Sequence, residues 1–226
     1  MNRIGNVLKM HQRDKFAWLI IPFMILGSSF VINLIVGFLS GVEIYTGGLM
    51  SIFIYMLVLG IIVLPQTFPF AISFSVRRTD YYSGTVLHAL ISSCFMAIIL
   101  LLLSAIEKAT NFWGTGLHFF HLPFLTDGNI VQQFIFNFLT LALLFFWGFT
   151  IGSVFRKFRA IGLFVLTLAC LLATTIMMVL IISKDWWDEI ANWFIDLTAF
   201  ELSLWFLPII LIFAIVSFAL IRRSTV

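Results

Sequence analysis

Charged residues are few in this sequence. Only 10% of its residues are Asp, Glu, Lys or Arg, whereas 62% are hydrophobic. A soluble domain of 226 residues cannot hide that much apolar surface from water. We therefore expect lipid to be the solvent for most of the chain. The long apolar runs also lack charged residues away from their ends, which argues against proton-driven carriers and voltage-gated channels.

The sequence also lacks the motifs on which enzymes rely. It has no G-x-x-x-x-G-K-[ST] loop to cradle the phosphates of ATP. No G-x-S-x-G, H-E-x-x-H or paired-glutamate motif lies within an apolar run. We therefore expect a protein that is not an enzyme, with no catalytic residue and no cofactor bound by this chain.

Cysteine is scarce as well. Cys94 and Cys170 both fall inside apolar runs, so we interpret them as reduced packing residues without a disulfide framework. His118 and His121 are three residues apart in an aromatic-rich loop, but no third ligand accompanies them. We interpret these histidines as interfacial residues and expect no metal site.

The apolar residues gather in runs that are long enough to cross a membrane. A spanning helix needs roughly 20 such residues to cross a hydrocarbon core of about 30 Å. Six runs meet this length, at about 18–39, 49–73, 84–106, 130–152, 160–182 and 203–221. They occupy most of the chain. We therefore expect a single all-α transmembrane domain over residues 1–226, with six transmembrane helices and no cleavable signal peptide.

The basic residues sort to one side of these six runs. Only Lys108 and Lys184 fall on the other side, where most of the acidic residues also lie. The basic side comprises Arg3, Lys9, Arg13, Lys15, Arg77, Arg78, Arg156, Lys157, Arg159, Arg222 and Arg223. Because short loops rich in Lys and Arg stay in the cytoplasm, we expect a multi-pass protein with both termini inside.

The N-terminal segment 2–16 has the pattern of a short amphipathic helix. Ile4, Val7 and Leu8 fall on one stripe, whereas Lys9 faces away. Such a helix, with a basic polar face, suits the inner surface of the membrane. The alternative is a basic anchor that only sets the orientation of the chain.

A second amphipathic pattern occurs on the outer side, over residues 185–202. Its apolar members recur every three or four residues, with acidic residues on the opposite face. The aromatic residues that stand out are Trp186, Trp187, Trp193 and Phe194. We predict a helix at the outer interface that runs straight into the sixth run. Two roles remain open, an aromatic belt or an element that shapes an outward exit or gate.

Two prolines interrupt the end of the second run. Pro65 and Pro69 are four residues apart, and each removes a backbone donor and clashes with the preceding turn. We therefore predict a kinked or broken helix here. Gln66 and the freed carbonyl groups would need partners within the protein, because lipid offers none.

The segment that follows has a recognisable sequence. Residues 68–84 read FPFAISFSVRRTDYYSG. This stretch resembles a segment of ABC-2 type (type V) ABC transporter permeases of Gram-positive bacteria that begins FPFALS-x-G-V, continues through an arginine pair and ends in [DN]-[FY]-x-x-G, with Ser75 where glycine is common. Such permeases have six spans, both ends inside, a surface helix at the start, a coupling helix after span two and outer helices before span six. The matching segments here are 2–16, 75–83 and 185–202.

The resemblance implies a subunit that works with partners in a bacterial cell membrane. A separate ABC ATPase subunit would bind ATP and Mg²⁺, and a second permease subunit, identical or similar, would pack through spans one and five. Residues implied as contacts for the ATPase are Arg77, Arg78, Thr79, Asp80, Tyr81 and Tyr82. We expect lipid but no nucleic acid as a further partner. The cargo would be an amphipathic or hydrophobic peptide, lipid or drug, moved by export.

Other interpretations of the same residues stay open. The arginines could serve only as topology signals, and the tyrosines as anchors at the membrane interface. The chain could also be the substrate-capture subunit of a vitamin importer, although Gly37 and Gly41 lie at the outer end of span one, where they do not fit a cytoplasmic partner. A membrane scaffold without a transport role is the third possibility.

Overall fold

The computed structural model describes residues 3–126 and 128–222, and these residues form an all-α fold with one pair of two-residue strands. The first half contains α1 (Arg3–Arg13), the π-helix η1 (Phe16–Ile20), α2 (Ile21–Ser40), β1 (Ile44–Tyr45), α3 (Met50–Ser73) and α4 (Arg78–Ala109). The second half contains the 3₁₀ helix η2 (Phe112–Gly114), β2 (Leu117–His118), α5 (Pro123–Thr126), α6 (Ile130–Ser183), α7 (Trp187–Asp196), α8 (Ala199–Leu204) and α9 (Phe206–Arg222).

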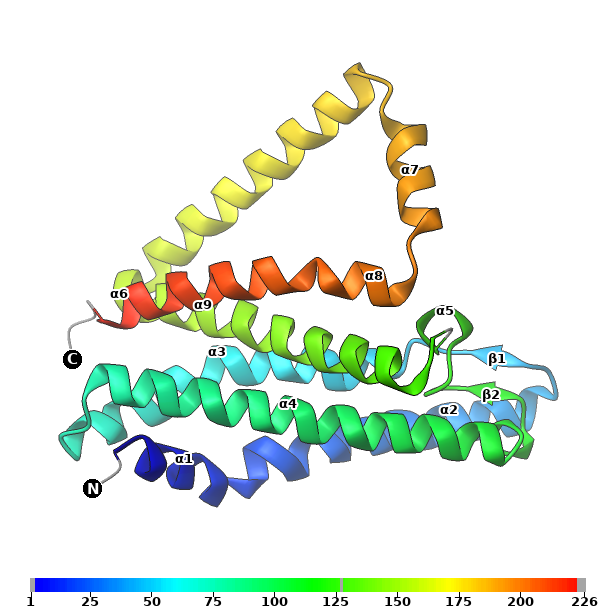
Figure 1. The fold of residues 1–226 in the computed structure, drawn as a ribbon, viewed down its shortest axis with the longest axis horizontal. Helices are drawn as coiled ribbons and strands as arrows, with labels where there is room; N and C mark the ends of the chain where they lie inside the picture. Colours follow the sequence, from blue (N-terminus) through cyan, green and yellow to red (C-terminus); the bar gives the residue numbers. More distant parts are fainter. Residues whose placement is uncertain (1–2, 127, 223–226) are drawn as a thin grey trace.

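The long helices pack side by side as a bundle (Figure 1). Within it, α3 packs most extensively on α6, and α6 also packs on α4 and α9. Glycines bring α3 and α6 very close, because a Cβ added at Gly60 would collide with the backbone of Phe145 and one at Gly148 with that of Leu57. Small residues at such positions are the usual means by which membrane helices approach each other.

The helix α6 is broken in the middle. Arg159 has φ 56° and ψ −151°, so the 54 residues of α6 form two helical arms, 130–158 and 160–183. Figure 1 shows the first arm inside the bundle and the second arm turning away from it toward α7. Nearly all residues of the second arm are exposed in the isolated chain.

Five helical stretches of the described chain are long and apolar enough to cross a membrane. They are Phe16–Ser40, Met50–Ser73, Arg78–Ala109, Ile130–Ser183 and Ala199–Arg222. These stretches cover the six predicted runs except for residue 49, and the two runs at 130–152 and 160–182 lie in the two arms of α6. The prediction of an all-α chain with several long apolar helices that could span a membrane is thus confirmed.

The prediction of a kinked or broken helix was wrong in its second form, because the second run is not broken at its prolines. The helix α3 continues without interruption through Pro65 and Pro69 to Ser73. Both prolines and Gln66 lie on the exposed face of α3, whereas Leu64 and Phe68 on the opposite face are fully buried. Packing of that buried face holds the helix together despite a penalty of about 3 kcal/mol for each proline.

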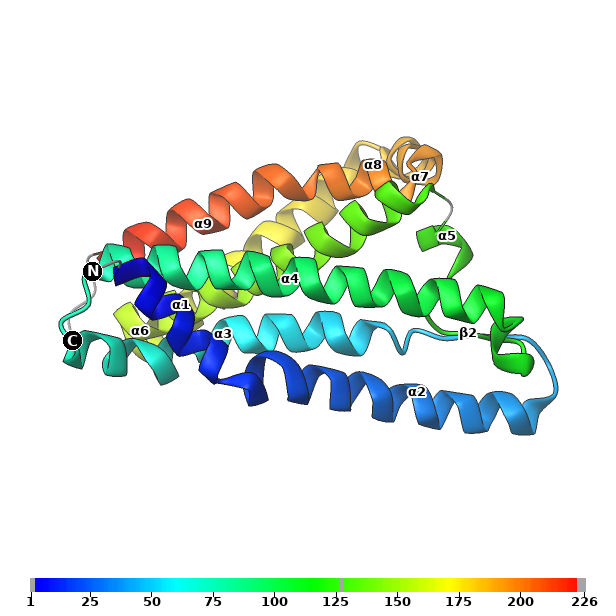
Figure 2. The ribbon, with the colours of Figure 1, turned by 60° about the horizontal axis from the view of Figure 1, so that its bottom comes forward.

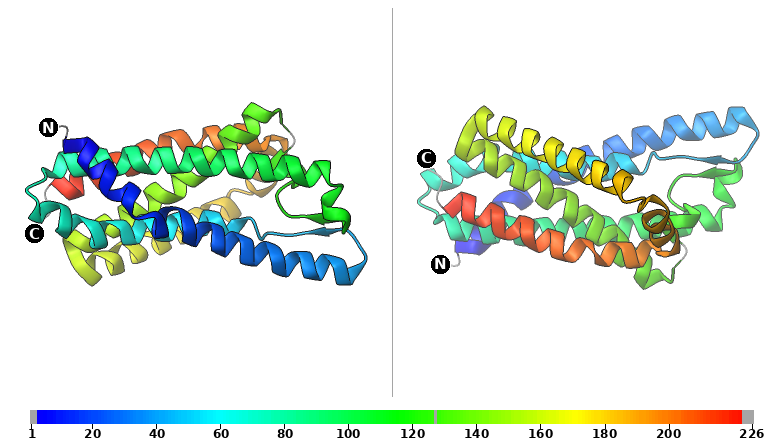
Figure 3. Two further views of the ribbon diagram at one scale, coloured as in Figure 1. Left: turned by 90° about the horizontal axis from the view of Figure 1, so that it is seen from below. Right: turned by 90° about the horizontal axis from the view of Figure 1, so that it is seen from above.

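The N-terminal segment forms a helix, as predicted, but its apolar stripe packs on α4. Figures 2 and 3 show α1 crossing the start of α4 before the chain turns into α2. Val7 is 2% exposed, and a Cβ added at Gly84 of α4 would lie 2.7 Å from the Val7 Cβ. The glycine thus allows the close approach of the two helices. Residue 2 of the predicted segment lies outside the described residues.

Candidate functional site

The turn between α3 and α4 is a tight connection at one end of the bundle. The Ser75 amide donates to the Ile72 carbonyl at 2.9 Å, and the Val76 amide donates to the Ala71 carbonyl at 3.3 Å. Ser75 has φ 56°, a left-handed conformation that glycine adopts at lower cost. The turn therefore has the geometry for which glycine would be the favoured residue at this position.

The candidate ATPase contacts divide into two groups in the structure. Arg77 and Thr79 are exposed, and Arg78 and Asp80 are half-buried. Arg77 precedes the first turn of α4, and Asp80 lies within that turn without capping it. Segment 75–83 is thus a turn followed by the beginning of the long apolar helix α4, and it does not form a separate coupling helix.

The two tyrosines of the same group face inward. Tyr81 is 0% exposed, and its hydroxyl lies 2.7 Å from the Thr67 Oγ1. The Tyr82 hydroxyl donates to the Ala214 carbonyl of α9 at 2.7 Å. The tyrosines therefore tie α4 to α3 and α9, and in the isolated chain they are positioned to support the exposed turn rather than to touch a partner.

Histidine and arginine side chains lie close to these tyrosines. Nothing in the sequence indicated that they belong to the same site. The His11 Nε2 of α1 lies 3.0 Å from the Thr85 Oγ1 of α4, and its ring stacks on His88 with the centroids 5.4 Å apart. Burial, together with the neighbouring His88, lowers the pKa of His11 from 6.5 to about 3. The Arg156 guanidinium lies over the Phe68 ring, 4.2 Å from its centroid. Only the resulting fold brings these residues together.

The opposite end of the bundle is organised by one carboxylate. Glu107, in the last turn of α4, is 0% exposed. Its two oxygens accept backbone N–H groups of Phe119, Phe120 and His121 at 2.9–3.0 Å, and the Trp113 Nε1 at 2.9 Å. This set of donors satisfies a buried carboxylate and folds the loop back onto the helix.

The loop around Glu107 also pairs with the connection between α2 and α3. Strands β1 and β2 are parallel, with Ile44 opposite Leu117 and Tyr45 opposite His118. The rings of Tyr45 and His118 stack with the centroids 4.2 Å apart. Among the described residues, no group of three or more His, Cys, Asp or Glu is arranged to hold a metal ion. The stacking gives His118 a packing role.

The outer amphipathic segment forms two helices. The helix α7 ends at Asp196, and α8 begins after Thr198, whose side chain forms a capping box with Glu201. The segment is therefore not one helix that runs straight into the last span. The predicted aromatic residues, all about half exposed in the isolated chain, are Trp186, Trp187, Trp193 and Phe194.

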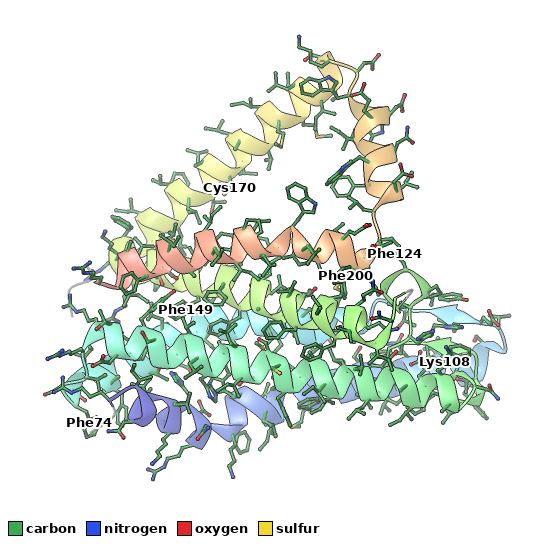
Figure 4. The ribbon with its side chains drawn as sticks, viewed as in Figure 1. Phe74, Lys108, Phe124, Phe149, Cys170 and Phe200 are labelled. Atoms are coloured by element: carbon green, nitrogen blue, oxygen red, sulfur yellow. The ribbon has the colours of Figure 1, made fainter. Side chains whose placement is uncertain are left out.

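Figure 4 relates the second arm of α6 to the bundle. Cys170 lies on this arm, away from the packed helices, whereas Phe149 of the first arm lies among them. Cys170 is exposed and Cys94 is half-buried, and both are free thiols. The second arm and α7 are thus mostly exposed in the isolated chain.

The comparisons with known proteins identify no family for this chain. No family model, curated protein or solved structure matches the chain at a significant level.

Proposed function

We propose that the chain is the membrane-spanning permease subunit of an ATP-driven ABC exporter of the ABC-2 type. The observation that carries the proposal is the turn between α3 and α4. It presents Arg77 and Thr79 at the surface, with Arg78 and Asp80 beside them, and it is backed by the buried Tyr81. A rigidly supported charged turn is what a separate ATPase needs to transmit force to spanning helices.

Six spans with both ends inside are part of this proposal. The reversal of α6 at Arg159 supports counting its two arms as separate spans. In Figures 1 and 3, the start of α1, the α3–α4 turn, the bend in α6 and the end of α9 lie at the same end of the bundle. That end carries Arg77, Arg156 and Arg222, and basic residues favour the cytoplasm. The membrane would be a bacterial plasma membrane.

The character of the spans supports an amphipathic or hydrophobic cargo, such as a peptide, lipid or drug. The one fully buried carboxylate among the described residues, Glu107, lies at the end of α4 and is occupied by four donors. A carrier of small ions needs charged groups along its path. ATP and Mg²⁺ would bind to the ATPase, and a second permease subunit, identical or similar, would complete the path.

The vitamin-importer alternative receives no support from its candidate glycines. Gly37 packs on the outer loop, where an added Cβ would lie 3.4 Å from the Leu117 Cβ. Gly41 has φ 64° and ends α2. Both glycines therefore have roles within the chain. A docking surface for another subunit would have to lie elsewhere.

The test is reconstitution with a candidate ATPase in lipid nanodiscs. We expect the triple variant Arg77→Ala/Arg78→Ala/Asp80→Ala to lose complex formation or ATP hydrolysis. The matched control, Lys9→Ala/Arg13→Ala, removes two exposed basic residues of α1 and leaves the turn intact.

A turn variant that behaves like the control would refute the coupling assignment. A wild-type chain that binds no ABC ATPase would favour the capture-subunit or scaffold interpretation.

A further inference from the structure

A groove of about 320 Å³ lies between the end of α9 and the part of α6 just before its bend. Figure 1 shows both segments at the end of the bundle that also carries the α3–α4 turn. The groove is lined by Lys157 of α6 and by Phe218, Ala219, Leu220 and Arg222 of α9. It therefore lies where two apolar runs end and basic residues follow.

Two cations line this groove. Lys157 is half-buried and Arg222 is exposed, and no acidic residue of the described chain is part of the lining. A third cation lies close by, because the Arg78 Nη1 donates to the Arg222 carbonyl at 3.3 Å. The Lys157 Nζ lies 4.9 Å from the centroid of the Phe158 ring, a weaker interaction than an ion pair with a phosphate. The lining thus selects a ligand that carries negative charge.

The rest of the lining is apolar and is held in place by the bundle. The Phe218 ring packs edge-on against that of Tyr82, with the centroids 5.1 Å apart, and the Tyr82 hydroxyl is itself bonded to α9. This wall exists before a ligand arrives, so binding requires little ordering of the protein. A free inorganic anion would leave Phe218 and Leu220 uncovered, whereas a hydrocarbon chain would cover them. The matching ligand is an amphiphile with an anionic head.

We infer that the groove binds the head group of an anionic phospholipid, of the phosphatidylglycerol type. Its phosphate would accept N–H groups of Lys157 and Arg222, and the start of an acyl chain would lie against Phe218. Basic pockets between membrane helices are known to hold anionic head groups. Phosphatidylcholine would fit less well, because its trimethylammonium group adds a positive charge beside the two cations. The site requires a membrane but no ATPase, so it does not depend on the proposed transport function.

Native mass spectrometry of the purified chain with added lipid tests the inference. Phosphatidylglycerol and phosphatidylcholine with the same acyl chains are compared at equal concentration. We expect the wild-type chain to retain phosphatidylglycerol about tenfold more strongly. Lys157→Ala/Arg222→Ala should lose most of this preference, whereas the exchange Lys157→Arg/Arg222→Lys keeps both charges and should keep it. Ala219→Trp, at an exposed lining position, fills the groove without changing its charge and should also reduce retention of phosphatidylglycerol.

The matched control is Lys9→Ala/Arg13→Ala, which removes one lysine and one arginine from the exposed face of α1. It should retain the lipid preference. Equal losses in the two alanine pairs would show that the overall positive charge attracts the lipid, and would overturn the inference. A wild-type chain without a preference would do the same, as would an Ala219→Trp variant that binds like the wild type.

A last arm of the experiment separates a lipid from a free anion. An excess of inorganic phosphate should leave phosphatidylglycerol bound, because phosphate alone cannot cover the apolar wall. Displacement by inorganic phosphate would overturn the assignment to a lipid. Thermal unfolding is measured for every variant, and if Lys157→Ala/Arg222→Ala does not fold, the wild-type preference and Ala219→Trp together decide.

Discussion

Ser75 shows how a single residue can hold a turn in a conformation that suits another amino acid. Its φ of 56° costs a non-glycine residue about 1 kcal/mol. We therefore expect Ser75→Gly to raise the free energy of unfolding by about this amount. Unfolding in mixed micelles of increasing SDS content measures the change.

The control for this prediction is Ser73→Gly, at the last helical residue of α3. Glycine is unfavourable in a helix, so this variant should be less stable than the wild type. Two variants with the same stability would show that the left-handed turn is not strained.

Glu107 is the residue on which the loop after α4 depends most. Glu107→Gln keeps the shape of the side chain but replaces one accepting oxygen by an NH₂ group, which would face backbone donors. We expect a loss of about 2 to 3 kcal/mol in the free energy of unfolding. Exposed Glu43, also in an outer connection, is the control, and Glu43→Gln should change stability little. Equal effects would contradict the role of Glu107.

His11 makes the docking of α1 depend on pH. The docked helix keeps His11 neutral down to a pKa of about 3, whereas a released helix binds a proton below 6.5. Docking is therefore complete above pH 6.5 and weakens as the pH falls toward 3. The groups that face His11 are His88, Thr85, Tyr81 and Trp18.

Spin labels on Asn6→Cys and Leu87→Cys, in a chain whose native cysteines are serine, measure this docking. Both sites are exposed. We expect the distance distribution to broaden as the pH falls from 7 to 4. His11→Gln should weaken the pH dependence, because an amide does not titrate in this range. A wild-type distribution that is the same at both pH values would contradict the prediction.

At the scale of elements, the contact between α3 and α6 depends on the absence of side chains. A Cβ added at Gly148 would collide with the Leu57 carbonyl. Gly148→Ala should therefore lower the free energy of unfolding by about 2 kcal/mol. Gly27 of α2 has no atom within 4 Å of an added Cβ, so Gly27→Ala is the matched control. If the two variants unfold alike, α3 and α6 are less tightly packed than described.

Most helices could be predicted from the sequence, because hydrophobic runs and amphipathic periods are local signals. The apolar runs and the helical character of 2–16 followed directly from them. The docking of Val7 on Gly84 was not predictable, because it joins residues far apart in the chain. The hydrogen bonds to Glu107 were not predicted, because most of the donors are backbone N–H groups, which every residue type except proline carries. Pro65 and Pro69 did not break α3, because packing of its buried face holds the helix together.

At the scale of the whole molecule, the second arm of α6 is the surface through which we expect a second copy of the chain to pack. Residues 160–183 are almost fully exposed in the isolated chain, and Cys170 lies on this arm. If two subunits pack through this arm, a short bis-maleimide should link Cys170 to its counterpart. We expect a band of twice the monomer mass in SDS gels of treated membranes.

Cys170→Ser should abolish the dimer band, whereas Cys94→Ser should leave it unchanged. A band that depends on Cys94, or no band at any reagent concentration, would contradict pairing through this arm. The readout requires only membranes that contain the protein. It therefore separates self-association from coupling to an ATPase.

The helix α4 connects the two ends of the molecule as one continuous rod. Its 32 residues, at 1.5 Å each, extend about 48 Å. One end begins at the exposed α3–α4 turn, and the other ends in the carboxylate that gathers the outer loop. A push that tilts the rod at its first end must move the outer loop at its far end, in the manner of a lever with no joint along its length.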